Sequence, residues 1–217
     1  MVSMQTTIDQ LRTALASAYP LTVLVSLEEE RLERLLGRFA AAAKPEPLPI
    51  TVWNCVDGFP SNGQAALTDP MAALDWVADK APRGVYLFKD LGEYLDDRRV
   101  LRRLRDTAMK IRNTGRFLFL LKQDASLPNP LKPLSYVVVS LFPDESELDA
   151  LVRGMVKSRG ISEPDLERLT NSLKGMSLTE VEHMLRRLLD RHGAIDEAFF
   201  ATVLDEKEQI TRKEGIL

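Results

Sequence analysis

Residues 21–30, Leu-Thr-Val-Leu-Val-Ser-Leu-Glu-Glu-Glu, constrain the fold of this chain more than any other stretch. Leu21–Val25 is a run of apolar and β-branched residues, which is typical of a buried strand, and Pro20 precedes it. Ser26 is a favourable N-cap residue, and Glu29 three positions later completes a capping-box pattern. The stretch therefore predicts a buried strand that runs directly into a helix, as in an α/β fold.

The same alternation of strand and helix signals continues to about residue 142. Apolar runs predict four further strands, at 50–55, 84–88, 117–121 and 136–141, and periodic apolar residues predict helices at 7–19, 27–43, 71–81 and 96–113. Helices between most of the strands favour a mostly parallel sheet of five strands, flanked by helices. The strand at 117–121 is apolar throughout, so we expect it in the middle of the sheet.

The pattern changes after Phe142–Pro143, where strand signals end and helix signals remain. Capped helix starts are expected at Asp144, Ser162 and Ser177, and a fourth helix begins near Asp196. We therefore expect two domains, an α/β core over residues 1–143 and a small four-helix lid over residues 144–217.

Composition excludes several classes of protein. With a net charge of -3 and a pI of about 5.6, the chain has no overall field that attracts nucleic acid or an anionic membrane. Cys55 is the single cysteine, so an internal disulfide is excluded, and the apolar runs are far shorter than a membrane helix. The polar N-terminus does not resemble a signal peptide. We expect a cytoplasmic protein without a metal, since His183 and His192 lack the spacing of metal ligands.

Four phrases, taken in order, resemble one protein family. They are Tyr19–Arg31, Asp69–Trp76, Leu101–Asp106 and Gly175–Glu182. They resemble the degenerate N-terminal module of the Ycf-type AAA ATPases, which belong to a conserved reading frame of chloroplasts and cyanobacteria. The resemblance implies an AAA-like core with a helical lid. The tail at 207–217 resembles the junction that precedes a second, active AAA module in that family.

The first strand–helix turn lacks the residues of a phosphate-binding loop. Such a loop needs glycines for close backbone approach, a lysine for the phosphates and a hydroxyl for Mg²⁺. Glu28, Glu29 and Glu30 occupy the first helical turn instead. Each would repel a nearby phosphate charge by about 4 kcal/mol at an intermediate dielectric. We therefore expect a degenerate nucleotide site that includes Ser26, with no ATP cofactor and no catalytic residue.

Two further strand ends belong to the same degenerate site. The third strand ends in Lys89 and Asp90, where a nucleotide-hydrolysing site would carry acids for Mg²⁺ and the attacking water. Lys89 takes the place of the metal ligand, so we interpret Asp90 as a loop acid or a cap. The fourth strand is followed by Gln123, at the place of a sensor residue, and we interpret it as a polar loop residue.

A second loop has the glycine spacing of a phosphate-binding loop. Gly58 and Gly63 follow the predicted strand at 50–55. Gln64 and Ala65 stand where the lysine and the hydroxyl residue are required. We therefore interpret this segment as an ordinary surface loop.

The predicted helix at 96–113 and the residues after it carry a dense basic cluster. Its arginines are Arg98, Arg99, Arg102, Arg103, Arg105, Arg112 and Arg116. The cluster has three interpretations: a surface for a protein partner, a set of contacts to nucleic-acid phosphates, or a solvated face with local ion pairs. No aromatic residues interleave with the arginines, which disfavours nucleic acid.

These observations favour a non-catalytic AAA-like module that acts in the assembly or regulation of an AAA ATPase. The resemblance implies a protein partner, either an AAA ATPase module or further copies of this chain, and no membrane. Two alternatives stay open. One is a nucleic-acid-associated adaptor similar to the degenerate AAA subunits of clamp loaders, and the other is a weak ATP-binding ATPase with an unusual site.

Overall fold

The computed structural model describes residues 4–17, 19–59, 66–140 and 142–213, and its contacts divide the chain into two units. The first, which we call the α/β unit, holds residues 5–140. The second, which we call the helical unit, holds the chain from residue 141 onward. Each unit buries its own set of apolar side chains, so the two are described separately.

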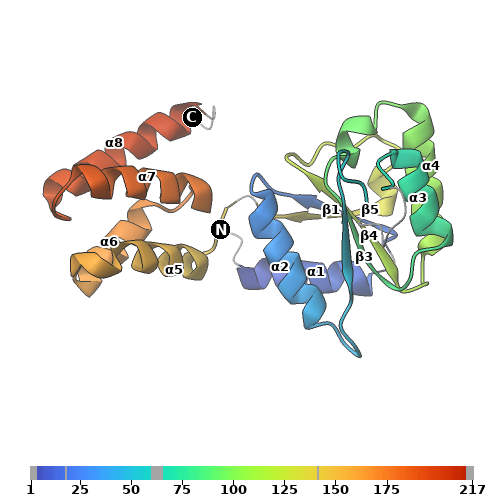
Figure 1. Ribbon diagram of the computed structural model, residues 1–217, viewed down its shortest axis with the longest axis horizontal. Coiled ribbons are helices and arrows are strands. Elements are labelled where there is room, and N and C mark those ends of the chain that lie inside the picture. Colours follow the sequence, from blue (N-terminus) through green and yellow to red (C-terminus); the bar gives the residue numbers. More distant parts are fainter. Residues whose placement is uncertain (1–3, 18, 60–65, 141, 214–217) are drawn as a thin grey trace. The chain divides into compact units, whose positions relative to one another are not determined.

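Five strands and four α-helices form the described part of the α/β unit (Figure 1). The strands are β1 Leu21–Val25, β2 Ile50–Trp53, β3 Gly84–Phe88, β4 Arg116–Lys122 and β5 Ser135–Val139. The helices are α1 Met4–Ala16, α2 Glu29–Ala41, α3 Pro70–Asp79 and α4 Arg98–Ile111, with 3₁₀ turns η1 at Leu91–Tyr94 and η2 at Lys132–Leu134. The bounds of β1 and β3 equal the predicted ones, because a short apolar run between polar or turn-forming residues defines a buried strand.

The five strands form one parallel sheet in the order β2-β3-β4-β1-β5. The register places Val23 of β1 beside Leu120 of β4 and Val137 of β5. Figure 1 shows α1 and α2 on one face of the sheet and α3 and α4 on the other. The middle strand is β4, whose Leu118 and Phe119 are both buried although they point to opposite faces. The predicted parallel sheet, with the strand at 117–121 in its centre, is confirmed.

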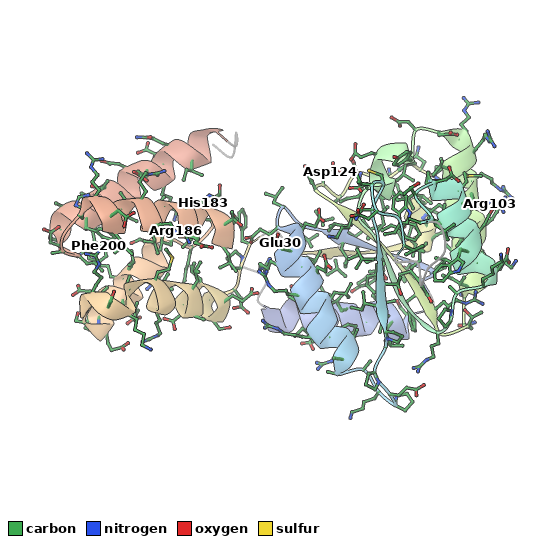
Figure 2. All side chains as sticks on the ribbon, viewed as in Figure 1. Glu30, Arg103, Asp124, His183, Arg186 and Phe200 are labelled. Carbon is green, nitrogen blue, oxygen red and sulfur yellow. The ribbon has the colours of Figure 1, made fainter. Side chains whose placement is uncertain are left out.

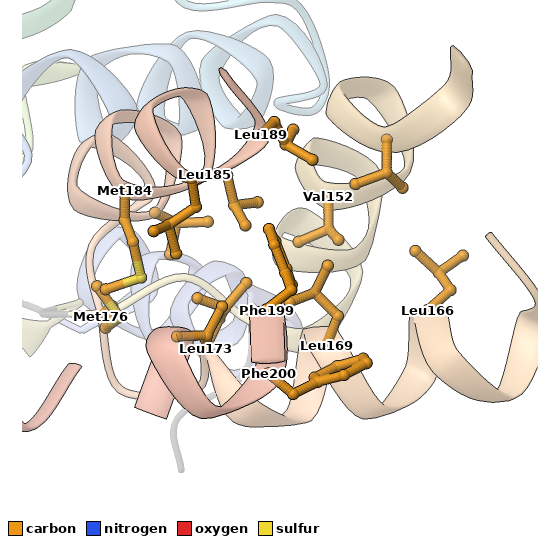
Figure 3. Packing of buried hydrophobic residues seen from close by; sticks show 14 of the residues in the cluster. Val152, Leu166, Leu169, Leu173, Met176, Met184, Leu185, Leu189, Phe199 and Phe200 are labelled. Carbon is orange, nitrogen blue, oxygen red and sulfur yellow. The ribbon is translucent and has the colours of Figure 1, made fainter. Parts of the chain in front are cut away.

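Four α-helices form the described part of the helical unit. They are α5 Glu145–Val156, α6 Glu163–Ser172, α7 Leu178–Arg191 and α8 Glu197–Lys213, with a 3₁₀ turn η3 at Lys157–Arg159. Asp144 and Ser177 form complete capping boxes at the starts of α5 and α7, as the sequence predicts. Figure 3 shows the core between the helices, where Phe199 and Leu185 are fully buried. The predicted four-helix architecture is confirmed.

One predicted capping box does not form. The N-cap of α2 is Glu28, and its side chain makes no capping hydrogen bond. The Ser26 N–H donates to the Lys122 carbonyl oxygen at 3.0 Å, so Ser26 still extends the ladder between β1 and β4. Its Oγ accepts a hydrogen bond from the Glu28 N–H at 3.1 Å. Because the sheet holds Ser26, α2 begins at Glu29, and the Glu29 carboxylate is available for another partner.

The glycine-containing loop after β2 is described only in part. Gly58 has a φ of 65°, and a Cβ atom there would lie 2.5 Å from the carbonyl carbon of Leu67. This close backbone approach requires glycine at position 58. The presence of Gly58 is therefore explained by the backbone, without a bound ligand. Gly63, Gln64 and Ala65 lie outside the described residues.

Candidate functional site at the carboxyl ends of the strands

The carboxyl ends of the parallel strands meet at one edge of the sheet, and the predicted degenerate site lies there. Ser26 follows β1, Lys89 and Asp90 follow β3, and Gln123 follows β4. These three strands are consecutive in the sheet, and the helices that follow β1 and β3 lie on opposite faces. Open parallel sheets bind their ligands at such a point, outside the carboxyl ends of the strands.

Lys89 lies between two glutamates of α2. Its Nζ is 2.6 Å from Glu29 Oε1 and 2.7 Å from Glu33 Oε2. Glu29 and Glu33 are one helical turn apart, so their carboxylates project from the same face of α2. The Lys89 side chain is 17% exposed, and partial burial strengthens both ion pairs by reducing the screening from water. Glu33 was not among the predicted site residues, although its i, i+4 spacing from Glu29 is visible in the sequence.

The pKa of Lys89 lies above that of an ordinary lysine. Burial acts in the opposite direction and lowers this pKa, but the hydrogen bonds and the negative charges of Glu29 and Glu33 outweigh it. Lys89 is therefore a fixed cation at neutral pH. It stands where a nucleotide-hydrolysing site would hold an acid for Mg²⁺.

A buried arginine connects the beginning of α2 with the end of β5. Arg31 Nη1 donates to the Ser140 carbonyl oxygen at 3.2 Å, and Nη2 donates to Ser140 Oγ at 3.3 Å. Arg31 Nη1 also lies 3.9 Å from Glu28 Oε2, and both side chains are almost completely buried. Arg31 was not among the predicted site residues, although its position four residues before Leu35 places it on the apolar stripe of the helix.

Asp90, at the end of β3, contacts Cys55 in the segment that follows β2. Its Oδ2 accepts a hydrogen bond from the Cys55 N–H at 2.9 Å. The hydrogen bond of the Cys55 thiol with the Asp90 carboxylate raises the pKa of this thiol, and burial adds to the effect. Asp90 precedes η1 without a side-chain capping bond. Asp90 thus occupies the N-cap position of η1, while its carboxylate is engaged by Cys55; the raised pKa of the Cys55 thiol leaves less of the reactive thiolate form.

The remaining predicted residues of this site lie apart from the ion pairs. The Glu30 side chain is 91% exposed, and its Oε2 lies 3.7 Å from Arg34 Nη1. Gln123 is also exposed. The structure therefore brings Glu29 and Lys89 together and places Glu28 beside Arg31, whereas Glu30 and Gln123 face solvent.

Part of the basic cluster is engaged in contacts between α4 and α3. Arg103 Nε lies 3.1 Å from Asp75 Oδ1, and Figure 2 shows Arg103 on the helical layer on the opposite side of the sheet from Glu30. Lys110 binds Asp79, and this hydrogen bond lowers the pKa of Asp79. These pairs join two neighbouring helices, so their charges are partly neutralised within the α/β unit.

Two further arginines also have partners within the described part of the chain, and four have none there. Arg102 Nε lies 3.0 Å from Asp106 Oδ2 on the same helix. Arg116 Nη1 donates to the carbonyl oxygens of Val77 and Ala78 at 2.8 and 2.9 Å, at the C-terminal end of α3. Within the described residues, no side-chain hydrogen bond or ion pair is found for Arg98, Arg99, Arg105 and Arg112.

The described residues contain no group of three or more His, Cys, Asp or Glu side chains that could hold a metal ion. No α-helix in the described part of the chain is both long enough and apolar enough to span a membrane.

The sheet order and the four additional helices define a module of the AAA type, and solved structures support this class. A chain of the Escherichia coli MS115-1 HORMA:CdnC:Trip13 complex aligns with a TM-score of 0.58 at 15% identity, covering 86% of this chain and 73% of that chain. The FIGL-1 AAA domain in complex with ADP aligns with a TM-score of 0.54 at 14% identity, covering 98% and 84%. A chain from work on katanin self-assembly aligns with a TM-score of 0.51 at 12% identity, covering 94% and 73%. At these identities the likeness shows the fold alone.

The chain belongs to the SpoVK-like AAA ATPase family. Residues 7–140 match the model of the family's N-terminal domain, and residues 146–214 match the model of its second domain. The AAA domain-containing protein ycf46 of Trieres chinensis is 27% identical over 96% of this chain, and that of Guillardia theta is 24% identical over 97%. The resemblance to the Ycf-type AAA family is thus confirmed. This chain spans only 43% and 42% of the length of these two relatives.

Proposed function

We propose that this chain is a non-catalytic AAA-like module that acts in the assembly or regulation of an AAA ATPase. In this proposal residues 1–143 are the core, residues 144–217 are the lid, and the nucleotide site is degenerate. The observation that carries it is the position of Lys89, whose ammonium group lies between Glu29 and Glu33 at the carboxyl edge of the sheet.

The charges at this edge are the reverse of those that Mg-ATP requires. A phosphate at the beginning of α2 would meet the carboxylate of Glu29, at a cost of about 4 kcal/mol per close pair of like charges. A Mg²⁺ ion at the end of β3 would meet the ammonium group of Lys89, at a similar cost. Separation of Lys89 from its two glutamates would add a further cost, because its side chain is largely sheltered from water.

The acid that remains at the end of β3 has another partner. Asp90 Oδ2 accepts a hydrogen bond from the Cys55 N–H, and the carboxylate also contacts the Cys55 thiol. Protonation of Asp90 as a general base would weaken the charge-assisted hydrogen bond that its carboxylate accepts from the partly buried Cys55 N–H. This arrangement supports a structural role for Asp90.

The comparisons support a protein partner. The relatives are AAA domain-containing proteins more than twice as long as this chain, so a further AAA module is the first partner to test. The names of two structural neighbours refer to a HORMA:CdnC:Trip13 complex and to katanin self-assembly. By analogy, we propose that this module contacts an AAA ATPase module or other copies of itself.

Calorimetric titration of the purified chain with Mg-ATP tests the degenerate site. We expect no binding heat up to near-millimolar nucleotide. Micromolar binding would contradict the proposal, and loss of that binding in Asp90→Asn would identify an unusual ATPase site. The assembly role is tested separately by adding this chain to the AAA module of a longer relative. A complex in sedimentation velocity or a changed ATPase rate is expected, and neither effect would contradict this role.

A nucleic-acid adaptor is the second candidate function. The observation in its favour is that the side chains of Arg98, Arg99, Arg105 and Arg112 have no hydrogen-bond or ion-pair partner within the described residues. Binding of duplex DNA that weakens steeply with salt would support it. If the double variant Arg98→Glu/Arg99→Glu bound DNA as tightly as the unmodified chain, this end of α4 would have no role in an adaptor.

A further inference from the structure

A groove lies at the amino-terminal ends of β1 and β4, on the edge of the sheet opposite the candidate nucleotide site. It consists of two adjoining hollows of about 300 Å³ and about 260 Å³, which share Tyr19, Pro20 and Arg112. We call it the Tyr19 groove. Thr22 and Asn113 line the first hollow, and Met109, Pro133 and Leu134 line the second.

The first hollow offers hydrogen-bonding groups without an internal partner. Thr22 is 4% exposed and lines the hollow; no side-chain hydrogen bond is found for it within the described residues, and its hydroxyl oxygen is not among the fully buried atoms that lack a partner. Asn113 has a left-handed φ of 63°, and its amide likewise has no partner there. Because the Thr22 hydroxyl borders the hollow, it can hydrogen-bond to a molecule that enters it. Both side chains are therefore available to hydrogen-bond to a ligand in the hollow.

The groove carries positive charge that is not neutralised. Among the described residues, no Asp or Glu lines either hollow. Arg112 lines both hollows and has no ion-pair partner within the described residues, in contrast to Arg102 and Arg103. Arg105 lies on α4, seven positions before Arg112, which follows the helix as its C-cap; the Arg105 Nε is buried and has no partner within the described residues. A ligand with a carboxylate would complement this charge.

The second hollow offers an apolar shelf beside Arg112. Tyr19 and Met109 are each 47% exposed and belong to the few large apolar side chains of the described residues that are this exposed. Pro133 and Leu134 complete the shelf. The centroids of the Tyr19 and Tyr136 rings lie 5.8 Å apart, and this ring contact holds Tyr19 in position. Adjacent exposed apolar side chains of this kind mark surfaces that bind another chain.

We infer that the Tyr19 groove binds an acidic segment of a partner protein in which carboxylates are interspersed with apolar side chains. One carboxylate pairs with Arg112, and polar groups of the segment hydrogen-bond to Thr22 and Asn113. An apolar side chain packs on Met109, Pro133 and Leu134. This inference rests on the assembly role proposed above and assigns it a surface and a partner chemistry.

The inference is tested with a fluorescein-labelled peptide of alternating glutamate and leucine residues, by fluorescence anisotropy without nucleotide. A peptide of alternating glutamine and leucine is the uncharged comparison. The glutamate peptide is expected to bind the intact chain more tightly by about tenfold, or ~1.4 kcal/mol. Arg112→Gln is expected to remove this preference, and Thr22→Val to weaken binding of the glutamate peptide by about threefold.

The matched control is Arg99→Gln. Arg99 is also exposed on α4 without a side-chain partner in the described chain, but it lines neither hollow, so this variant is expected to bind both peptides as the intact chain does. Equal binding of the two peptides, no binding of either, or an equal loss in Arg99→Gln would overturn the inference. Tighter binding of a labelled single-stranded oligonucleotide through Arg112 would assign the groove to nucleic acid. Mg-ATP binding leaves the test unaffected, so this inference and the degenerate-site proposal can fail separately.

Discussion

Lys89 and Glu29 form an ion pair of 2.6 Å between the end of β3 and the first turn of α2, although 60 positions separate them in the chain. Parallel strands bring their carboxyl ends to one edge, and α2 begins at that same edge because it follows β1. In open parallel sheets, ligands such as nucleotides bind at this carboxyl edge. Here the ammonium group of Lys89 pairs with the carboxylates of Glu29 and Glu33 at this edge.

Lys89→Met is expected to destabilise the α/β unit by about 1–2 kcal/mol, because Glu29 and Glu33 would repel each other without the cation between them. Urea unfolding followed by tryptophan fluorescence measures this, since both tryptophans, Trp53 and Trp76, lie in the α/β unit. The control is Arg34→Met, which breaks an exposed ion pair on the same helix and is expected to cost less than ~0.5 kcal/mol. An equal loss of unfolding free energy in the two variants would contradict the stabilising role of Lys89 between its two glutamates.

Arg116→Met is expected to lower the free energy of unfolding of the same unit by about 1–2 kcal/mol. The variant keeps most of the apolar stem but leaves the carbonyl oxygens of Val77 and Ala78 without their donor. Arg98→Met serves as the comparison, because the Arg98 side chain is exposed and has no partner within the described residues, and a change within ~0.5 kcal/mol is expected. If both variants lost the same stability, the distinction between structural and free arginines of this region would be wrong.

Cys55 is expected to be alkylated by iodoacetamide only at unusually high pH. Its hydrogen bond with the Asp90 carboxylate, together with burial, raises the pKa of the thiol, and only the thiolate reacts. Asp90→Asn is expected to shift the midpoint of the rate–pH profile to lower pH. Because Cys55 is the single cysteine, mass spectrometry of the whole chain reports this reaction alone. Asp57→Asn, which removes a nearby carboxylate bonded to Asn54, is expected to leave the midpoint almost unchanged.

The helical unit is expected to lose stability as the pH falls below the normal titration range of glutamate, near pH 4. Bidentate hydrogen bonds from Arg153 and Arg168 lower the pKa values of Glu163 and Glu197, respectively. A lowered pKa means that the stabilisation is complete above the unfolded-state pKa and is lost as the pH falls through the folded-state value. Thermal unfolding followed by far-ultraviolet circular dichroism checks this, with tryptophan emission reporting the α/β unit separately.

Glu163→Gln is the matched variant for this pH dependence. It keeps the size of the side chain but removes the titrating group, so its stability is expected to change less between pH 7 and pH 3 than that of the intact chain. An unchanged pH dependence in this variant would show that the pair of Glu163 with Arg153 contributes nothing to the acid response.

Much of the fold could be predicted because its signals are local. Leu21–Val25 is a buried strand because every residue in it is apolar or β-branched, and the sheet then covers both of its faces. The capping boxes at Asp144 and Ser177 formed as predicted, since a cap depends on residues only three positions apart. The capping box at Ser26 failed for a non-local reason, because the Ser26 N–H is bound to Lys122 in the neighbouring strand.

The sequence by itself determined the order of strands and helices, the change to helices alone after residue 142, and the glutamates at the beginning of α2. Only the tertiary structure decided that Lys89 would face Glu29 and Glu33, that Arg31 would be buried against Ser140, and that Arg112 would border an open groove. The physical reason is range. Propensity and capping act over a few residues, whereas a side chain's charge partner is set by which strand ends and helix faces the packed sheet brings together.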